Sequence, residues 1–295
     1  MTLFKQLNCL KVSIVAGFLL FLQPAQAQQM DTASLSAFME QKVRMLKDNN
    51  LTLAVASKDT LIYKNDIKTF NVARGQGEAG YISELFTTVL ALMMVDEGKF
   101  GLDDKVAQYL PEFAKYGKNY ITVRHCLTHM TGIQVPSKLE LFSRGKFESL
   151  DQEANKYASL EIQTNPGTET RFSDRGFAIV ARIIEATNKN KKFDNLMQQR
   201  LFRPLGMRGT TFQTLDGSQP SPVFGARSTA GDLVQFARML LNGGTLNGIT
   251  FLKPESVDAL RSISSEAASF KGAPKGMERY DYTMGAWATE TNGGK

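Results

Sequence analysis

The feature that most constrains this chain is a strongly apolar helical pattern directly after a glycine-rich stretch. The apolar residues recur at the i, i+3, i+4, i+7 spacing of one helix face: Ile82, Leu85, Phe86, Val89, Leu90, Met93 and Met94. Gly98 lies where such a helix would end, and glycine is favoured just past a helix C-terminus. We therefore predict one long helix between Ile82 and Gly98.

The stretch before this helix, GQGEAG (75–80), has the spacing of the G-x-G-x-x-G fingerprint that binds dinucleotides. That fingerprint needs a strand before it, a helix after it and an acidic residue at the tip of a second strand about 20 residues later. At that distance Asp96 and Glu97 end a helix, and no strand lies between. We interpret the glycines as a loop that leads into the helix.

Residues 1–27 have the pattern of a secretory signal peptide. Lys5 and Lys11 precede the apolar run VSIVAGFLLFLQ, and Ala25-Gln26-Ala27 forms a small-x-small cleavage signal. The sequence predicts cleavage after Ala27 and a periplasmic or secreted mature chain over residues 28–295. No second long apolar run predicts a membrane span.

Cleavage would remove two lysines and no acidic residue, which lowers the formal net charge from +6 to +4. Because no basic run is present, we expect no nucleic-acid partner. The mature chain would retain only Cys126, so an internal disulfide is excluded, and the apolar setting RHCLTH predicts a buried thiol.

The two histidines of the chain, His125 and His129, are four residues apart and would share a face of a helix, as zinc ligands do. No glutamate follows the first histidine as in H-E-x-x-H, and no third ligand is evident. We expect capping or packing roles for both, with no metal and no cofactor.

Further elements follow from periodicity and turn signals. Helices are predicted over about 31–48, 174–187, 193–201, 231–242 and 254–263, and Thr122 is placed to cap a short helix. Residues 51–57 and 60–64 predict a hairpin around Lys58-Asp59, and residues 280–289 alternate like one strand. Strands at both ends with helices between predict an α/β fold of the α+β type, with one mixed sheet.

Several segments, in order along the chain, together resemble one family: DEGKFGLDDKVAQYLPEF, ITVRHCLTHMTGI, NPGTETRFSDRGFAIVARIIEAT, FRPLGMRGTTF, and ARSTAGDLVQFARMLLNGG followed by LKPESV. They are similar to the serine β-lactamase-related family, which includes class C β-lactamases, D-alanyl-D-alanine peptidases and allied esterases. The resemblance runs from about residue 51 to 287. It implies a mostly antiparallel sheet flanked by helices, with a helical subdomain inserted between about residues 100 and 215.

The resemblance also implies a serine that opens the long helix and a lysine three residues later, which can accept the serine proton. Phe86-Thr87 and the helix end at Asp96–Lys99 fix the register. Tyr81 then occupies the serine position and Glu84 the lysine position. Ser83 is no substitute, because it lies two residues further along and Phe86 follows it at the offset where a lysine is needed.

The second motif of the family, Y-x-N, supplies a tyrosine for proton transfer. Aligned by Pro166-Gly167 and Gly176, this chain has Phe172-Ser173-Asp174 there. Phe172 carries no titratable group, so three catalytic positions differ from the family pattern. We expect Tyr81, Glu84, Phe172 and Asp174 to lie in the cleft between sheet and subdomain.

A third motif, a strand with K-T-G or H-x-G, would follow residues 280–289, and the sequence stops at Lys295. The C-terminal strands that would pair with LTLAVAS are therefore absent from this sequence, as in a truncated gene or a fragment. Without them the sheet would have an exposed edge.

Three functions follow as hypotheses. The first is a pseudo-enzyme that keeps the family fold without acyl transfer. The second is an active hydrolase of altered chemistry, an esterase, peptidase or β-lactamase-like enzyme, in which Glu84 activates Tyr81. The third is a cell-envelope binding module that holds a peptidoglycan-type peptide, an ester or a glycan in the cleft, with contacts from the polar stretch 135–165.

Overall fold

The computed structural model describes residues 31–45, 51–67, 76–135, 147–214 and 217–289. The chain divides into two compact units, residues 1–49 and 50–295. The described part of the first unit contains helix α2 (Thr32–Val43), which confirms the helix predicted from residue 31. Its N-terminus is capped by the Asp31 carboxylate, which accepts hydrogen bonds from the backbone N–H groups of Ala33 and Ser34 at 3.1 and 3.0 Å.

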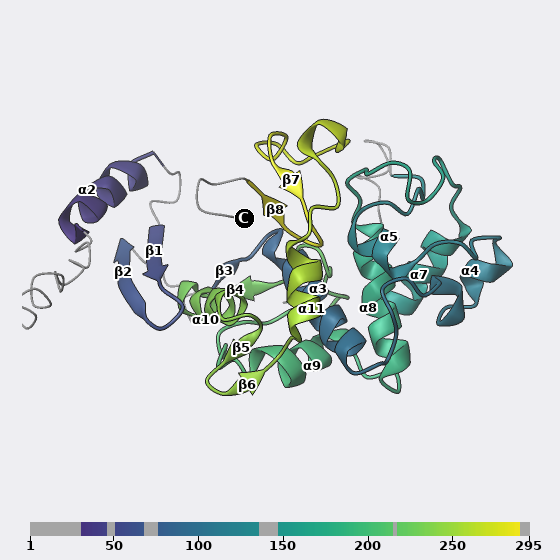
Figure 1. Cartoon of the computed structure of the whole chain (residues 1–295), viewed down its shortest axis with the longest axis horizontal. Coiled ribbons are helices and arrows are strands. Elements are labelled where there is room, and N and C mark those ends of the chain that lie inside the picture. The colour runs from purple at the N-terminus through teal and green to yellow at the C-terminus, as the bar shows by residue number, and fades with distance from the viewer. Residues whose placement is uncertain (1–30, 46–50, 68–75, 136–146, 215–216, 290–295) are drawn as a thin grey trace, which may run out of the picture. The chain divides into compact units, whose positions relative to one another are not determined.

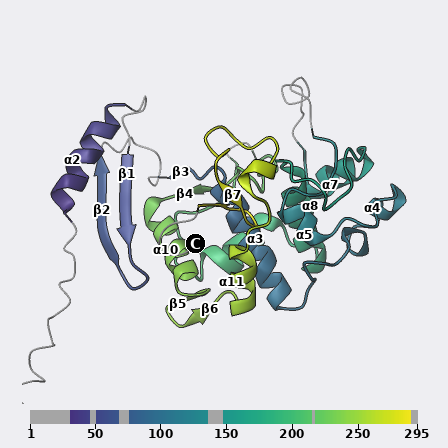
Figure 2. The same ribbon diagram turned by 45° about the horizontal axis from the view of Figure 1, so that its top comes forward.

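The second unit is built around helix α3 (Ile82–Asp96), the long helix predicted from its apolar spacing. Most of its residues are buried, because it packs against α8 (Arg175–Thr187) and α11 (Pro254–Arg261) on different sides. Figures 1 and 2 both place α3 beside these two helices. Gly98 has φ +70° just past the C-terminus of α3, so glycine stops the helix as expected.

Short helices fill the region between α3 and residue 215. They are η2 (Val106–Gln108), α4 (Glu112–Lys115), α5 (Val123–Leu127), α7 (Leu150–Ser159), α9 (Phe193–Leu196) and the π-helix η3 (Met197–Phe202). The amphipathic helix α8 holds them together through contacts with α5 and α7. Thr122 caps α5, because its hydroxyl accepts a hydrogen bond from the His125 N–H at 3.1 Å.

The helix predicted over residues 193–201 changes from α-helical to π-helical hydrogen bonding along its length. The helix expected over 193–201 is α-helical only in α9 and continues as the π-helix η3. The Arg203 N–H donates to the Gln198 carbonyl five residues back at 3.0 Å, which is the π-helical offset. Apolar spacing does not distinguish the two hydrogen-bonding patterns.

The described strands form four two-stranded sheets, all antiparallel. The hairpin of β1 (Leu51–Ala56) and β2 (Leu61–Ile67) is the one predicted, with a bulge between Val55 and Ala56. The other pairs are β3 (Gly77–Glu78) with β4 (Arg227–Ser228), β5 (Thr245–Leu246) with β6 (Ile249–Thr250), and β7 (Asp281–Tyr282) with β8 (Trp287–Ala288).

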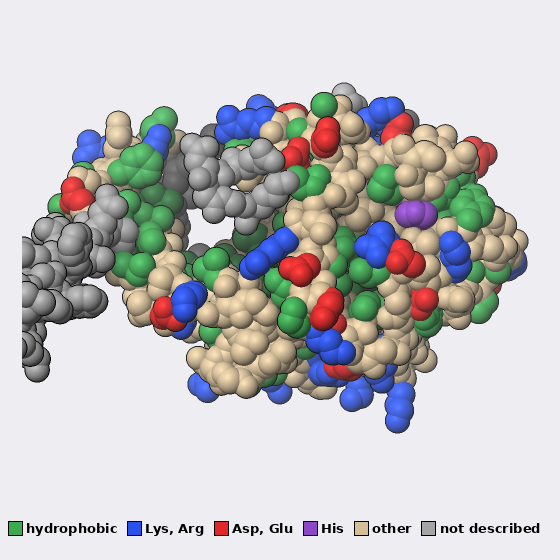
Figure 3. Space-filling model, in the orientation of Figure 1, with side chains coloured by type: hydrophobic (Ala, Val, Ile, Leu, Met, Phe, Trp, Pro, Cys, Tyr) green, Lys and Arg blue, Asp and Glu red, His purple; other side chains and the backbone are tan. Residues whose placement is uncertain are grey.

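Two strand predictions were wrong. Residues 280–289 form the hairpin β7–β8 because Gly285, at φ +79°, reverses the chain. In the described residues the strands at the two ends of the chain pair locally, so they do not join one mixed sheet. The remaining helices are α10 (Ala230–Leu241) and η4 (Ala267–Ser269). The architecture is α/β with antiparallel pairing, and acidic and basic side chains are intermixed over the face drawn in Figure 3.

Candidate functional site

The N-terminal turn of α3 places Glu84 in the interior of the second unit. Its side chain is only 1% exposed. Glu84 Oε2 accepts a hydrogen bond of 3.2 Å from the hydroxyl of Tyr282, which lies 198 residues further along the chain. The positive end of the helix dipole also favours a carboxylate in the first turn. Glu84 is therefore held inside the protein rather than presented to solvent.

His129 approaches the same oxygen of this carboxylate, and its ring contacts that of Tyr282 at a centroid distance of 4.9 Å. Its Nε2 is 3.8 Å from Glu84 Oε2, and both side chains are buried. His129 Nδ1 is 2.9 Å from the Ser173 carbonyl oxygen and 3.3 Å from the Ser173 backbone nitrogen, so the backbone of Ser173 fixes the imidazole ring. Nε2 is therefore the ring nitrogen that faces the Glu84 carboxylate.

Tyr282 completes this buried set, and we refer to Glu84, His129 and Tyr282 together as the Glu84 triad. Burial raises the pKa of Tyr282 well above its usual value, and the Glu84 charge and the hydrogen bond to it raise this pKa further. The Gly285 N–H donates to the Tyr282 oxygen at 3.1 Å. A side chain at Gly285 would lie 2.4 Å from Thr88 Oγ1, so only glycine allows this hairpin to approach α3 so closely.

Tyr81 lies at the N-cap of α3 and does not contact a base through its hydroxyl. Its ring packs edge-on against Phe172 and Phe224, at centroid distances of 5.4 and 4.8 Å. Burial, and then the Glu84 charge, raise the pKa of Tyr81. Among the described residues none forms a hydrogen bond with its hydroxyl. A nucleophile needs a lowered pKa or a hydrogen-bonded base, and Tyr81 has neither.

The other predicted site positions lie near α8. Phe172 packs between Tyr81 and His129, the latter at a ring distance of 4.8 Å. Asp174 is the residue that precedes α8 and is partly exposed. The structure thus places Phe172 in ring contact with Tyr81 and His129, and Glu84 beside His129. Asp174 lies at the N-cap of α8.

Ser83, which lies between Tyr81 and Glu84 in the sequence, is fully buried. Its hydroxyl accepts a hydrogen bond from the Ala226 N–H at 3.1 Å, across 143 residues of sequence. A hydroxyl fixed in this way joins α3 to β4 and is not presented to a substrate.

The histidines and the cysteine have the structural roles expected from the sequence. His125 takes part in the N-cap of α5, and His129 lies beyond the end of α5 with φ +54°, so the two do not share a helix face. Among the described residues, no three metal-ligating side chains lie together. Cys126 is a free buried thiol whose pKa is raised by burial.

Sequence reasoning missed Tyr282 as a member of the site. The available signal was Gly285 inside an otherwise alternating segment, because an isolated glycine in a strand pattern marks a turn or a close backbone approach. The polar stretch 135–165, where we expected ligand contacts, is only partly described, since residues 136–146 lie outside the described ranges.

The family model described as Beta-lactamase matches residues 82–294, so the chain belongs to the β-lactamase family. The chain is 27% identical over 215 residues to penicillin-binding protein 4 of Amycolatopsis lactamdurans, covering 62% of this chain and 56% of that protein. It spans between 38% and 60% of the length of the curated relatives that it matches.

Solved structures support the fold. A penicillin-binding protein homologue from Caulobacter crescentus aligns with a TM-score of 0.69 at 17% identity, covering 88% of this chain and 81% of that one. EstCE1, described as a hydrolase with promiscuous acyltransferase activity, aligns with a TM-score of 0.70 at 18% identity, covering 88% and 84%. At sequence identities this low, the two structures support a shared fold and nothing further about this chain. Among the described residues, no helix is both long and apolar enough to cross a bilayer.

Proposed function

We propose that this chain is a secreted pseudo-enzyme of the β-lactamase family, which keeps the fold without serine-type acyl transfer. The observation that carries the proposal is the burial of Glu84 in the Glu84 triad. At the position where the family resemblance implies a basic lysine, this chain has a carboxylate whose partners are Tyr282 and His129. Among the described residues, no base is hydrogen-bonded to the hydroxyl of Tyr81, the residue at the implied nucleophile position.

The groups around Glu84 support the same proposal. Tyr81 occupies the implied serine position, and its raised pKa keeps the phenol protonated at neutral pH. Phe172, at the implied tyrosine position, can neither donate nor accept a proton. The same facts weigh against the alternative in which Glu84 activates Tyr81, because the carboxylate hydrogen-bonds to Tyr282 instead.

One observation favours binding as a second candidate function. Tyr81 and Phe224 form an aromatic pair in which Phe224 is 43% exposed, and the adjacent Ile82 is 38% exposed. Aromatic side chains of this kind contribute large contact areas in binding sites. A peptidoglycan-type peptide, an ester or a glycan in the cleft fits this surface, consistent with export of the chain by its predicted signal peptide.

The proposal is tested by labelling the purified chain from Gln28 with a fluorophosphonate and with a fluorescent penicillin. Intact-mass measurement reports any covalent adduct, with an active serine-type family enzyme as the positive control and circular dichroism to confirm folding. We expect no adduct on this chain. A stoichiometric adduct mapped to one residue would identify a nucleophile and overturn the proposal.

A further inference from the structure

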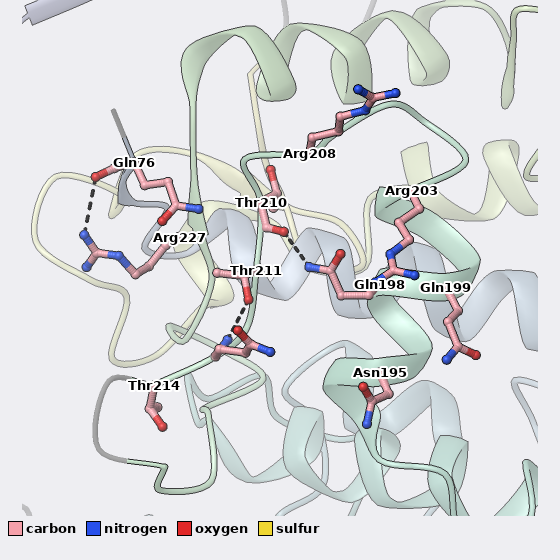
Figure 4. A pocket seen from close by; sticks show the side chains of 11 residues that line it. Gln76, Asn195, Gln198, Gln199, Arg203, Arg208, Thr210, Thr211, Thr214 and Arg227 are labelled. Atoms are coloured by element: carbon pink, nitrogen blue, oxygen red, sulfur yellow. Dashed lines mark hydrogen bonds between the residues drawn. The ribbon is translucent and has the colours of Figure 1, made fainter. Parts of the chain in front are cut away.

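A polar hollow with a volume of about 780 Å³ lies apart from the residues of the candidate site. Neither Tyr81 nor any member of the Glu84 triad is among the residues that line it. Its walls come from the segment before β3, from α9 and η3, from residues 208–214 and from β4 (Figure 4). The lining residues are Gln76, Asn195, Gln198, Gln199, Arg203, Arg208, Thr210, Thr211, Gln213, Thr214 and Arg227.

The charge of this hollow is positive. Among the residues that the structure describes, its lining includes three arginines and no aspartate or glutamate. Arg227 is engaged, since it donates to the Gln76 carbonyl at 3.3 Å and lies 4.0 Å from Glu78, outside the lining. Arg203 and Arg208 are exposed, and their side chains make no ion pair or hydrogen bond with a described residue. Two guanidinium groups are therefore available to an anionic ligand.

The uncharged lining residues are arranged to bind hydroxyl groups. The side-chain amides of Gln76 and Gln198 donate to the backbone carbonyls of Gly209 and Thr210, at 2.7 and 2.6 Å. These bonds fix both amide groups and leave their oxygen atoms as acceptors. The Thr211 hydroxyl accepts from the Gln213 N–H at 3.0 Å and can still donate.

The helical wall of the hollow is the π-helix η3, which carries Gln198 and Gln199. Segments of π-helix occur frequently at functional sites. Gln199 also lines a second, smaller hollow of about 230 Å³. The basic residues of that hollow are Lys99, Lys189, Lys191 and Arg200. Arg200 is paired with Glu97, so the three lysines are the unpaired cations described in this second hollow, which meets the larger one at Gln199.

We propose that the 780 Å³ hollow binds an acidic carbohydrate, with Arg203 and Arg208 each contacting a carboxylate and the amide and threonine groups contacting sugar hydroxyls. Paired N–H groups of arginine match a carboxylate bidentately. A nucleic acid fits less well, because the described part of the lining has no aromatic side chain on which a base could stack. This binding site is independent of the proposed loss of acyl transfer.

The test is a calorimetric titration of the purified chain with trigalacturonate. We expect binding, and we expect Arg203→Gln and Arg208→Gln each to weaken it about tenfold, the effect of one charge-assisted contact. Arg279→Gln removes the same charge from an exposed position outside the hollow and should leave the affinity unchanged. Circular dichroism confirms that the variants are folded.

Four outcomes would overturn the proposal. The first is no binding of trigalacturonate, and the second is equal binding of galactotriose, which has the hydroxyls without the carboxylates. The third is an equal loss in Arg279→Gln, which would indicate attraction by net charge alone. The fourth is competition by inorganic phosphate or by a single-stranded DNA oligonucleotide at the concentration of trigalacturonate, which would indicate an anion site without sugar recognition.

Discussion

The variant Tyr282→Phe tests whether one hydroxyl stabilises the buried Glu84 carboxylate. The ring remains, and with it the packing against Phe270 and Trp287 at centroid distances of 5.2 and 4.9 Å. The variant loses the 3.2 Å hydrogen bond to Glu84 and the acceptor of the Gly285 N–H. A hydrogen bond to a charged group contributes about 1.5–3 kcal/mol, and solvent does not screen these buried groups, so we expect the free energy of unfolding to fall by about 2–3 kcal/mol.

Urea unfolding followed by circular dichroism measures this change, and a thermal scan should show a melting temperature about 5–10 °C lower for a chain of this size. Tyr280→Phe is the matched control, because its hydroxyl accepts only from the exposed Arg279, and we expect a change below about 0.5 kcal/mol. A double-mutant cycle with Glu84→Gln should show coupling of about 1 kcal/mol or more. Unchanged stability of Tyr282→Phe, or strict additivity with Glu84→Gln, would refute this account of the Glu84 triad.

Three further predictions concern other parts of the second unit. Gly285→Ala should destabilise the fold by about 2 kcal/mol or more in urea unfolding, because the new methyl group would contact Thr88. Gly272 has a similar positive φ and open space around it, so Gly272→Ala should lower the free energy of unfolding by only about 1 kcal/mol. Equal losses in the two variants would count against the contact between Gly285 and α3. The Cys126 thiol should resist iodoacetamide at pH 8 in the folded protein and react after unfolding, because burial raises its pKa; rapid native labelling would contradict this. The pKa of Asp104 is lowered, first by the hydrogen bond from Tyr109, so its stabilising effect is present above its unfolded pKa and is lost as pH falls through the folded pKa. Asp104→Asn should therefore show a smaller loss of stability below about pH 4 than the unchanged chain, and an identical acid profile would exclude this role.

Local patterns predicted much of the fold because local forces determine these elements. The apolar spacing from Ile82 to Met94 marks α3, and the Thr122 side chain caps α5, as its position predicts. The β1–β2 hairpin follows from two β-rich runs around a turn at Lys58 and Asp59. Each of these signals lies within a few residues of the structure that it specifies.

The site was harder to predict because its contacts join distant parts of the sequence. Alignment with the family motifs identifies Tyr81, Glu84 and Phe172 as the residues at the implied catalytic positions. Their function in this chain stays a prediction. No local pattern indicates that Tyr282, 198 residues from Glu84, donates to its carboxylate. His129 was correctly expected to pack, yet its position beside Glu84 depends on tertiary structure.

The burial of Glu84 bears on how a family site can lose its chemistry. A lone carboxylate in a protein interior is destabilising, so position 84 can hold glutamate only with compensating partners, here the α3 N-terminus, the Tyr282 hydroxyl and the His129 ring. A lysine at this position would place its ammonium at the positive end of α3 and deprive Tyr282 of its charged acceptor. Restoring the family residue at position 84 would therefore disturb the contact between α3 and the β7–β8 hairpin. Glu84 and its partners are part of what holds this unit together, so the proposed loss of acyl transfer would be coupled to its stability.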